Sequence, residues 1–124
     1  MMEDSQRDLW LGTHQGLTRM TFPSALDPGA GNQTLQVQRY DERHGLPDSR
    51  VMSVFEDRDG AIWVGMWSGG PARLKPGSDR FERIPGIGGP EGTVFSISQD
   101  QYGYIWFGTR YGAYRLDIHD GDIA

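Results

Sequence analysis

The sequence predicts an all-β fold assembled from repeated four-stranded antiparallel sheets. Glycine supplies 18 of the 124 residues, about twice its average share and without a Gly-X-Y period, which favours many tight turns between short strands. A segment of the form apolar, Trp, apolar, Gly occurs three times, at residues 9–12, 62–65 and 105–108. Aligning residues 51–69 with residues 94–112 without gaps gives eight identities in 19 positions. The chain is therefore an internal repeat rather than one irregular domain.

The residues around each tryptophan keep a fixed register. An aspartate lies six residues before each tryptophan and a glycine six residues after it. We expect Asp57 and Asp100 to accept hydrogen bonds from the backbone amides of their own turns, a common role for aspartate before glycine. The residues that define the repeat are Trp10, Gly12, Asp57, Gly60, Trp63, Gly65, Asp100, Gly103, Trp106 and Gly108.

The tryptophans are separated by 53 and then 43 residues, in the range of about 40–50 residues that is typical of β-propeller blades. The longer interval needs an insertion, which we place in an extended hairpin loop at residues 23–33. The predicted blades cover residues 1–42, 46–85 and 91–124, and the first and last are incomplete. Because propellers close with four to eight blades, three blades are not a closed ring in one chain.

The middle repeat predicts the elements of one blade. Short apolar runs predict strands at residues 51–56, 61–66, 72–75 and 80–84, with turn residues between them. Ile62, Trp63 and Val64 place apolar side chains on both faces of the sheet, as is required when neighbouring blades cover both sides. Gly65 and Gly108 follow the tryptophan where a side chain is expected, which indicates close backbone approach or a bulge.

Composition and motifs exclude several classes of function. The net charge of −5 without a Lys/Arg run argues against nucleic acid as a partner. The chain has no cysteine and no apolar stretch long enough to enter a membrane. No cofactor or metal site is predicted. The Asp57–Gly60 turn lacks the later glutamate of a calcium loop, and the Gly86–Gly92 segment lacks the lysine of a phosphate loop. The three histidines are scattered along the chain and do not have the spacing of metal ligands. No nucleophile motif occurs, so we predict that the chain is not an enzyme.

Candidate ligand-binding residues lie four positions after each tryptophan, in loops expected on one common face. These positions hold His14, Trp67 and Arg110, and Tyr111 follows directly. Trp67 is suited to stack on a sugar ring, and Arg110 to bind a carboxylate or sulfate. In the alternative interpretation these residues vary because they touch only solvent, and Trp67 covers the edge of its blade.

The repeat resembles the two-component regulator propeller family, whose pattern is approximately Val-x-Ser-Ile, Asp-x-x-Gly-x-Ile-Trp-Ile-Gly-Thr and Gly-Leu-x-Arg. Departures from the pattern are Arg7 in place of the turn glycine, Met66 and Trp67 in place of threonine and its successor, and Pro71 in a strand. The resemblance implies a periplasmic or extracytoplasmic sensor region of a hybrid histidine kinase, which binds a ligand, often a carbohydrate, and transmits the signal without catalysis.

Two other functions remain open at this stage. One is a scaffold propeller for protein interaction. The other is a metal-dependent lyase similar to the virginiamycin B lyase propellers, which share the Gly-x-Ile-Trp-Phe pattern seen at residues 103–107. The exposed blade faces also predict self-association, with two chains giving six blades, unless flanking blades cover these faces.

Overall fold

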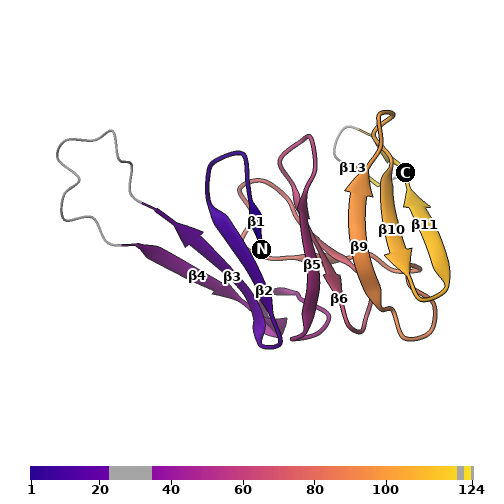
Figure 1. Ribbon diagram of the computed structural model, residues 1–124, viewed down its shortest axis with the longest axis horizontal. Coiled ribbons are helices and arrows are strands. Elements are labelled where there is room, and N and C mark those ends of the chain that lie inside the picture. Colours follow the sequence, from indigo (N-terminus) through magenta and orange to yellow (C-terminus); the bar gives the residue numbers. More distant parts are fainter. Residues whose placement is uncertain (23–34, 120–121, 124) are drawn as a thin grey trace.

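The computed structural model describes residues 1–22, 35–119 and 122–123. In this part of the chain the regular secondary structure consists of antiparallel strands and one short 3-10 helix. The three blades lie side by side in chain order and form an open fan (Figure 1). The first blade contains β1 (Met2–Glu3), β2 (Leu9–Thr13), β3 (Gly16–Thr21) and β4 (Gln36–Tyr40). The second contains β5 (Val51–Glu56), β6 (Ile62–Met66), β7 (Ala72–Leu74) and β8 (Glu82–Arg83). The third contains β9 (Val94–Gln99), β10 (Ile105–Thr109) and β11 (Gly112–Leu116).

The first blade differs from the middle one in the length of its strands, and the third blade differs in the number of strands in its sheet. The first blade has all four strands, although β1 is only two residues long. The third blade has three strands in its described sheet, and the separate two-stranded hairpin of β12 (Ile118–His119) and β13 (Asp122–Ile123) follows it along the chain. A short 3-10 helix, η1 (Glu42–His44), follows the first blade. The insertion predicted at residues 23–33 lies outside the described residues, between the paired strands β3 and β4.

Two hydrophobic cores fill the spaces between blades, as the two-sided apolar pattern of the strands predicts. Trp10 stacks on Tyr40 in the first core, with ring centroids 5.7 Å apart, and packs with Val64 and Ile62 of the second blade. Trp63 packs against Phe107 of the third blade in the second core, at the same centroid distance of 5.7 Å. Each blade thus has a Trp face, which carries the repeat tryptophan, and an opposite aliphatic face. The Trp face of one blade packs on the aliphatic face of the next.

An arginine on the neighbouring strand covers each tryptophan. Trp10 pairs with Arg19, Trp63 with Arg73 and Trp106 with Arg115 in the strand register. The guanidinium carbons lie 5.0, 5.4 and 5.9 Å from the respective ring centroids. Such cation–π contacts stabilise the indole face by about 0.5–2 kcal/mol, depending on desolvation. Arginine is therefore part of the repeat, in all three blades.

Gly65 allows two strands of neighbouring blades to approach closely, which confirms the predicted close approach and bulge. The register of β5 against β6 shifts between Val51 and Ser53, close to Gly65. A Cβ atom on Gly65 would lie 2.4 Å from Ser53 Oγ and 2.8 Å from the Val94 carbonyl oxygen. We expect Gly65→Ala to lower the free energy of unfolding by about 1–3 kcal/mol through overpacking, measured by urea denaturation. Gly108→Ala at the equivalent position of the third blade is the control for backbone crowding, because a Cβ there would meet only the Ser96 side chain and no backbone atom.

Arg7 stands in a backbone conformation that favours glycine. Its φ is 66°, whereas the equivalent residues Gly60 and Gly103 have φ of 87° and 93°. A side chain in this region costs about 1–2 kcal/mol, and glycine removes that cost while adding freedom to the unfolded chain. We expect Arg7→Gly to raise the unfolding free energy by about 0.5–1 kcal/mol in thermal or urea denaturation. Gly103→Arg should lower the unfolding free energy, although its side chain would stand in open space. If neither substitution changes the unfolding free energy, the backbone at Arg7 is not strained.

Candidate functional site

The turn after β6 and the linker into β9 form one connected surface. The Gly69 amide donates to the Glu91 carbonyl at 3.1 Å, and the Gly70 amide donates to the Gly92 carbonyl at 2.8 Å. The Thr93 hydroxyl donates to the Trp67 carbonyl at 2.7 Å. We call this surface, formed by residues 67–70, 86–93 and 110–111, the linker face. Backbone hydrogen bonds hold residues 67–70 against residues 86–93, and side-chain contacts of Glu91 connect residues 110–111 to them.

Glu91 joins Arg110 and Tyr111 on the linker face. The Tyr111 hydroxyl donates to Glu91 Oε2 at 3.0 Å, and Arg110 Nη1 lies 3.9 Å from the same oxygen. A Cβ atom on Gly89 would lie only 2.4 Å from the Tyr111 ring, so glycine lets the ring lie directly on the linker. The hydrogen bond to Glu91 raises the pKa of Tyr111, and desolvation adds to it. The phenol stays protonated at neutral pH and remains a donor.

Trp67 lies on the same face, beside the linker that leads into the second blade. Its amide donates to the Arg50 carbonyl at 3.0 Å, and the Arg50 guanidinium lies 5.8 Å from the centroid of its ring. Arg50 in turn pairs with Asp48 at 2.9 Å. The Trp67 side chain is still 39% exposed. An aromatic surface therefore remains open for stacking, next to a fixed positive charge.

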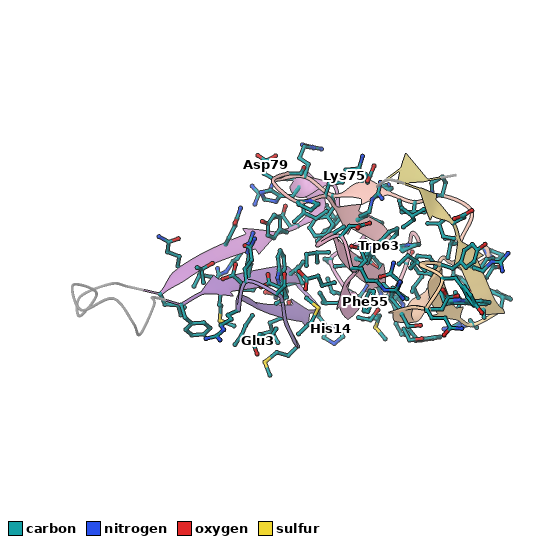
Figure 2. The ribbon with its side chains drawn as sticks, turned by 90° about the horizontal axis from the view of Figure 1, so that it is seen from above. Glu3, His14, Phe55, Trp63, Lys75 and Asp79 are labelled. Atoms are coloured by element: carbon teal, nitrogen blue, oxygen red, sulfur yellow. The ribbon has the colours of Figure 1, made fainter. Side chains whose placement is uncertain are left out.

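His14 lines a cavity of its own on the first blade, in the turn after β2. The cavity measures about 520 Å³ and is also lined by Leu17, Thr18 and Arg39. Figure 2 places His14 on the same side of the molecule as Phe55 of β5, with Lys75 and Asp79 on the opposite side. The structure thus brings Arg110 and Tyr111 together at Glu91 and places Trp67 in a turn that is hydrogen-bonded to the same linker. Among the described residues, no hydrogen bond or ring contact connects His14 with these three.

Sequence reasoning missed Glu91 and Arg50, which contact three predicted site residues between them. Glu91 lies in the glycine-rich segment Gly86–Gly92, which belongs to the linker between β8 and β9. The signal that could have found Glu91 is that a charged residue stands in a linker otherwise made of glycine, proline and isoleucine.

The repeat aspartates bind their own turns, as predicted, and also bind the tryptophans. Asp57 Oδ1 accepts from the Asp59 and Ala61 amides at 2.9 and 3.0 Å, and Oδ2 accepts from the Trp63 indole nitrogen at 2.8 Å. Asp4 and Asp100 make the same three bonds with their own turns and tryptophans. The indole bond was not predicted, although the constant six-residue interval between aspartate and tryptophan is its signal.

The hydrogen bonds that Asp100 accepts favour its ionised form. The Trp106 indole, more than any other group, lowers the pKa of Asp100, and amide donors of the turn add to it. Since the folded-state pKa lies below the unfolded one, this contribution to stability is complete at neutral pH. It is lost as the pH falls through the folded-state pKa. Both Asp57 oxygens accept hydrogen bonds, which supports the structural interpretation of the Asp57–Gly60 turn over the calcium one.

A second cavity, of about 530 Å³, opens between the first and second blades at the end opposite the linker face. Its walls include Trp10, Arg19, Asp57 and Lys75. The Arg19 guanidinium is already paired with Asp8 at 2.7 Å. Within residues 1–22, 35–119 and 122–123, no group of three or more His, Cys, Asp or Glu side chains could hold a metal ion. The same residues contain no helix long and apolar enough to cross a membrane.

Comparison with known proteins agrees with this architecture. The family model described as "Two component regulator propeller" matches residues 45–68 and 88–111. The extracellular domain of the hybrid two-component system BT3049 of B. thetaiotaomicron superposes with a TM-score of 0.68 at 26% identity, over 90% of this chain and 14% of that one. The extracellular domain of the one-component system BT4673 of the same organism has a TM-score of 0.70 at 21% identity, over 98% of this chain and 17% of that one. No curated protein matches.

The family model and the solved structures match different parts of this chain and of the longer proteins. The chain spans less than a fifth of the length of either solved structure. Each matched segment contains the first strand of a blade, the aspartate turn and the strand that carries the tryptophan: β5 and β6 in the second blade, and β9 and β10 in the third. The chain is a β-propeller segment, and its second and third blades each contain a match to the two-component regulator propeller repeat.

Proposed function

We propose that this chain is a non-catalytic recognition segment of a sensor propeller in a bacterial two-component receptor, exposed outside the cytoplasm. The observation that carries the proposal is the linker face, where Glu91 contacts the exposed Tyr111 and Arg110. The exposed Trp67 lies in the turn that is hydrogen-bonded to the same linker. The two similar solved structures are extracellular domains of two-component or one-component systems. Recognition residues on loops above a rigid repeated frame are the usual arrangement of binding proteins.

The chemistry of the linker face suits a neutral polyol such as a carbohydrate. Tyr111 is 53% exposed and offers a flat ring on which a sugar can stack, as does Trp67. The free lone pairs of the Glu91 carboxylate accept hydroxyl hydrogens, and Arg110 donates to hydroxyl or acidic oxygens. Because Glu91 and Arg110 offset each other in charge, the surface does not favour a strongly charged ligand.

Titration of the chain with an oligosaccharide panel, followed by calorimetry, tests the proposal. We expect Trp67→Ala and Tyr111→Ala each to weaken binding about fivefold or more, since stacking contributes on the order of 1 kcal/mol or more. Glu91→Gln should weaken it without altering the fold. The matched control is Tyr102→Ala, because Tyr102 is 76% exposed in the aspartate turn of the third blade, away from the linker face. Unchanged affinity in all three linker-face variants would refute the site.

A protein-interaction scaffold is a second candidate, and one observation favours it. Met52 and Phe95 are the second residues of the inner strands β5 and β9, and both are exposed, by 39% and 44%. Equivalent positions in successive blades thus present a short apolar row. If the row binds a protein, Phe95→Ser should weaken binding of that partner in calorimetry, while the linker-face variants leave it unchanged.

A further inference from the structure

The two internal interfaces follow one packing rule. In each, the Trp face of a blade contacts four apolar positions on the aliphatic face of the next blade. The strand register makes these positions equivalent, since Ile62 pairs with Leu74 and Ile105 pairs with Leu116. The four residues are Val54, Ile62, Val64 and Leu74 in the second blade and Ile97, Ile105, Phe107 and Leu116 in the third.

The first blade carries the same apolar set on a face that no blade covers. Leu9 and Leu11 flank Trp10 in β2, so they point away from the second blade, and Met20 pairs directly with Leu9. Leu11 is 37% exposed, whereas the equivalent Val64 and Phe107 are fully buried. Met1 stands at the position of Val54 and is also exposed. The open aliphatic face of the first blade therefore carries the apolar positions on which a Trp face packs.

The third blade presents the complementary face. Trp106 keeps the aspartate and arginine contacts of the repeat, yet it is only half-buried, whereas Trp10 and Trp63 are buried. Figure 1 places β10 and β11 at one end of the fan and the first blade at the other. The two open faces lie at opposite ends, so they cannot meet within one copy.

A polar contact at the edge of each interface repeats in the same way. The Ser5 amide donates to Glu56 Oε1 at 2.9 Å, and the equivalent Arg58 amide donates to Gln99 Oε1 at 2.9 Å. Each acceptor is the last residue of an inner strand. Glu3 holds that acceptor position in β1 and is exposed, while Gln101 holds the donor position in the third blade. The open faces thus match in a hydrogen-bonding pair as well as in apolar shape.

We propose that the Trp face of the third blade binds the aliphatic face of the first blade in a second copy of this chain. The contact is head to tail, with Trp106 of one copy on Leu9, Leu11 and Met20 of the other and the Gln101 amide donating to Glu3. Since the two contacting surfaces differ, the interface is heterologous. It continues the two internal interfaces by the same rule.

Light scattering on purified variants tests this contact. The unmodified chain should show a mass above the 13.9 kDa of one copy that rises with concentration. Leu11→Glu and Trp106→Glu should each give monomers when alone, because each blocks one of the two faces. Mixed together, they should form a one-to-one pair and nothing larger, since one intact Trp face and one intact aliphatic face remain. Circular dichroism of each variant verifies that it is folded.

The matched control is Tyr102→Ala, which removes an exposed aromatic side chain from the aspartate turn of the third blade rather than from an open blade face. It should associate like the unmodified chain. A monomer at several hundred micromolar would overturn the proposal and leave the open faces to further blades or to another protein. Association that persists in both glutamate variants would overturn it too, because the contact would then lie elsewhere. If Trp106→Glu fails to fold, Leu11→Glu mixed with unmodified chain should cap the assemblies and lower their mean mass.

Discussion

Trp63→Ala should lower the free energy of unfolding by about 3–5 kcal/mol. The Trp63 side chain has no exposed surface, and it packs between the second and third blades against Phe107, Ile105 and Val94. Its removal opens a cavity in the second core and leaves the Arg73 guanidinium without its ring. Since whole domains are stable by about 5–15 kcal/mol, a large part of the chain's stability depends on this side chain.

Urea denaturation followed by far-ultraviolet circular dichroism measures this loss without relying on tryptophan emission. Trp106→Ala is the matched control, because it deletes the same residue from the same strand position but from a face that no blade covers. In dilute solution, where copies do not associate, its cost should be clearly smaller. Equal costs for the two variants would show that burial between blades is not the source of the stabilisation.

Asp57→Asn should destabilise the fold by about 1–3 kcal/mol, although the two side chains have almost the same shape. The asparagine carbonyl can still accept from the Asp59 and Ala61 amides. Its NH₂ group would then face the Trp63 indole N–H, which now donates to Asp57 Oδ2 at 2.8 Å. A buried donor that faces another donor carries the cost of an unmade hydrogen bond. The midpoint of urea unfolding should therefore fall with little change in its slope.

A double-mutant cycle isolates the contribution of the indole bond. Trp63→Phe removes the N–H group and keeps an aromatic ring. In that background Asp57→Asn should cost less than in the unmodified chain, and the difference is the coupling between the two residues. A coupling near zero would mean that Asp57 acts only on its own turn.

Much of the fold followed from the sequence because the repeat marks each element three times. Asp57, Gly60, Trp63 and Gly65 recur with fixed spacing, and a fixed spacing predicts strand, turn and register together. The blade architecture, the open end-to-end arrangement and the burial of Trp10 and Trp63 are confirmed. The outer strand β8 is shorter than predicted because it pairs with only two residues of β7.

The candidate site was less predictable because its contacts are not local. Glu91 reaches Tyr111 from 20 positions away, and neither the repeat nor any motif connects the two. Arg73 escaped notice since Pro71 and an extra turn residue shift it relative to Arg19 and Arg115, and only the strand register shows that all three cover a tryptophan. The ligand-binding role of His14, Trp67, Arg110 and Tyr111 stays a prediction.

The two-sided character of each blade gives the protein a direction. Every blade offers one kind of surface to its successor and another to its predecessor, and the same few residues decide the fit. When one repeat is duplicated or deleted, the interface between the new neighbouring blades therefore keeps the same chemistry, provided that the boundaries of the change lie within linkers. Genes that encode such repeats can gain or lose a blade by recombination without the evolution of new interface residues.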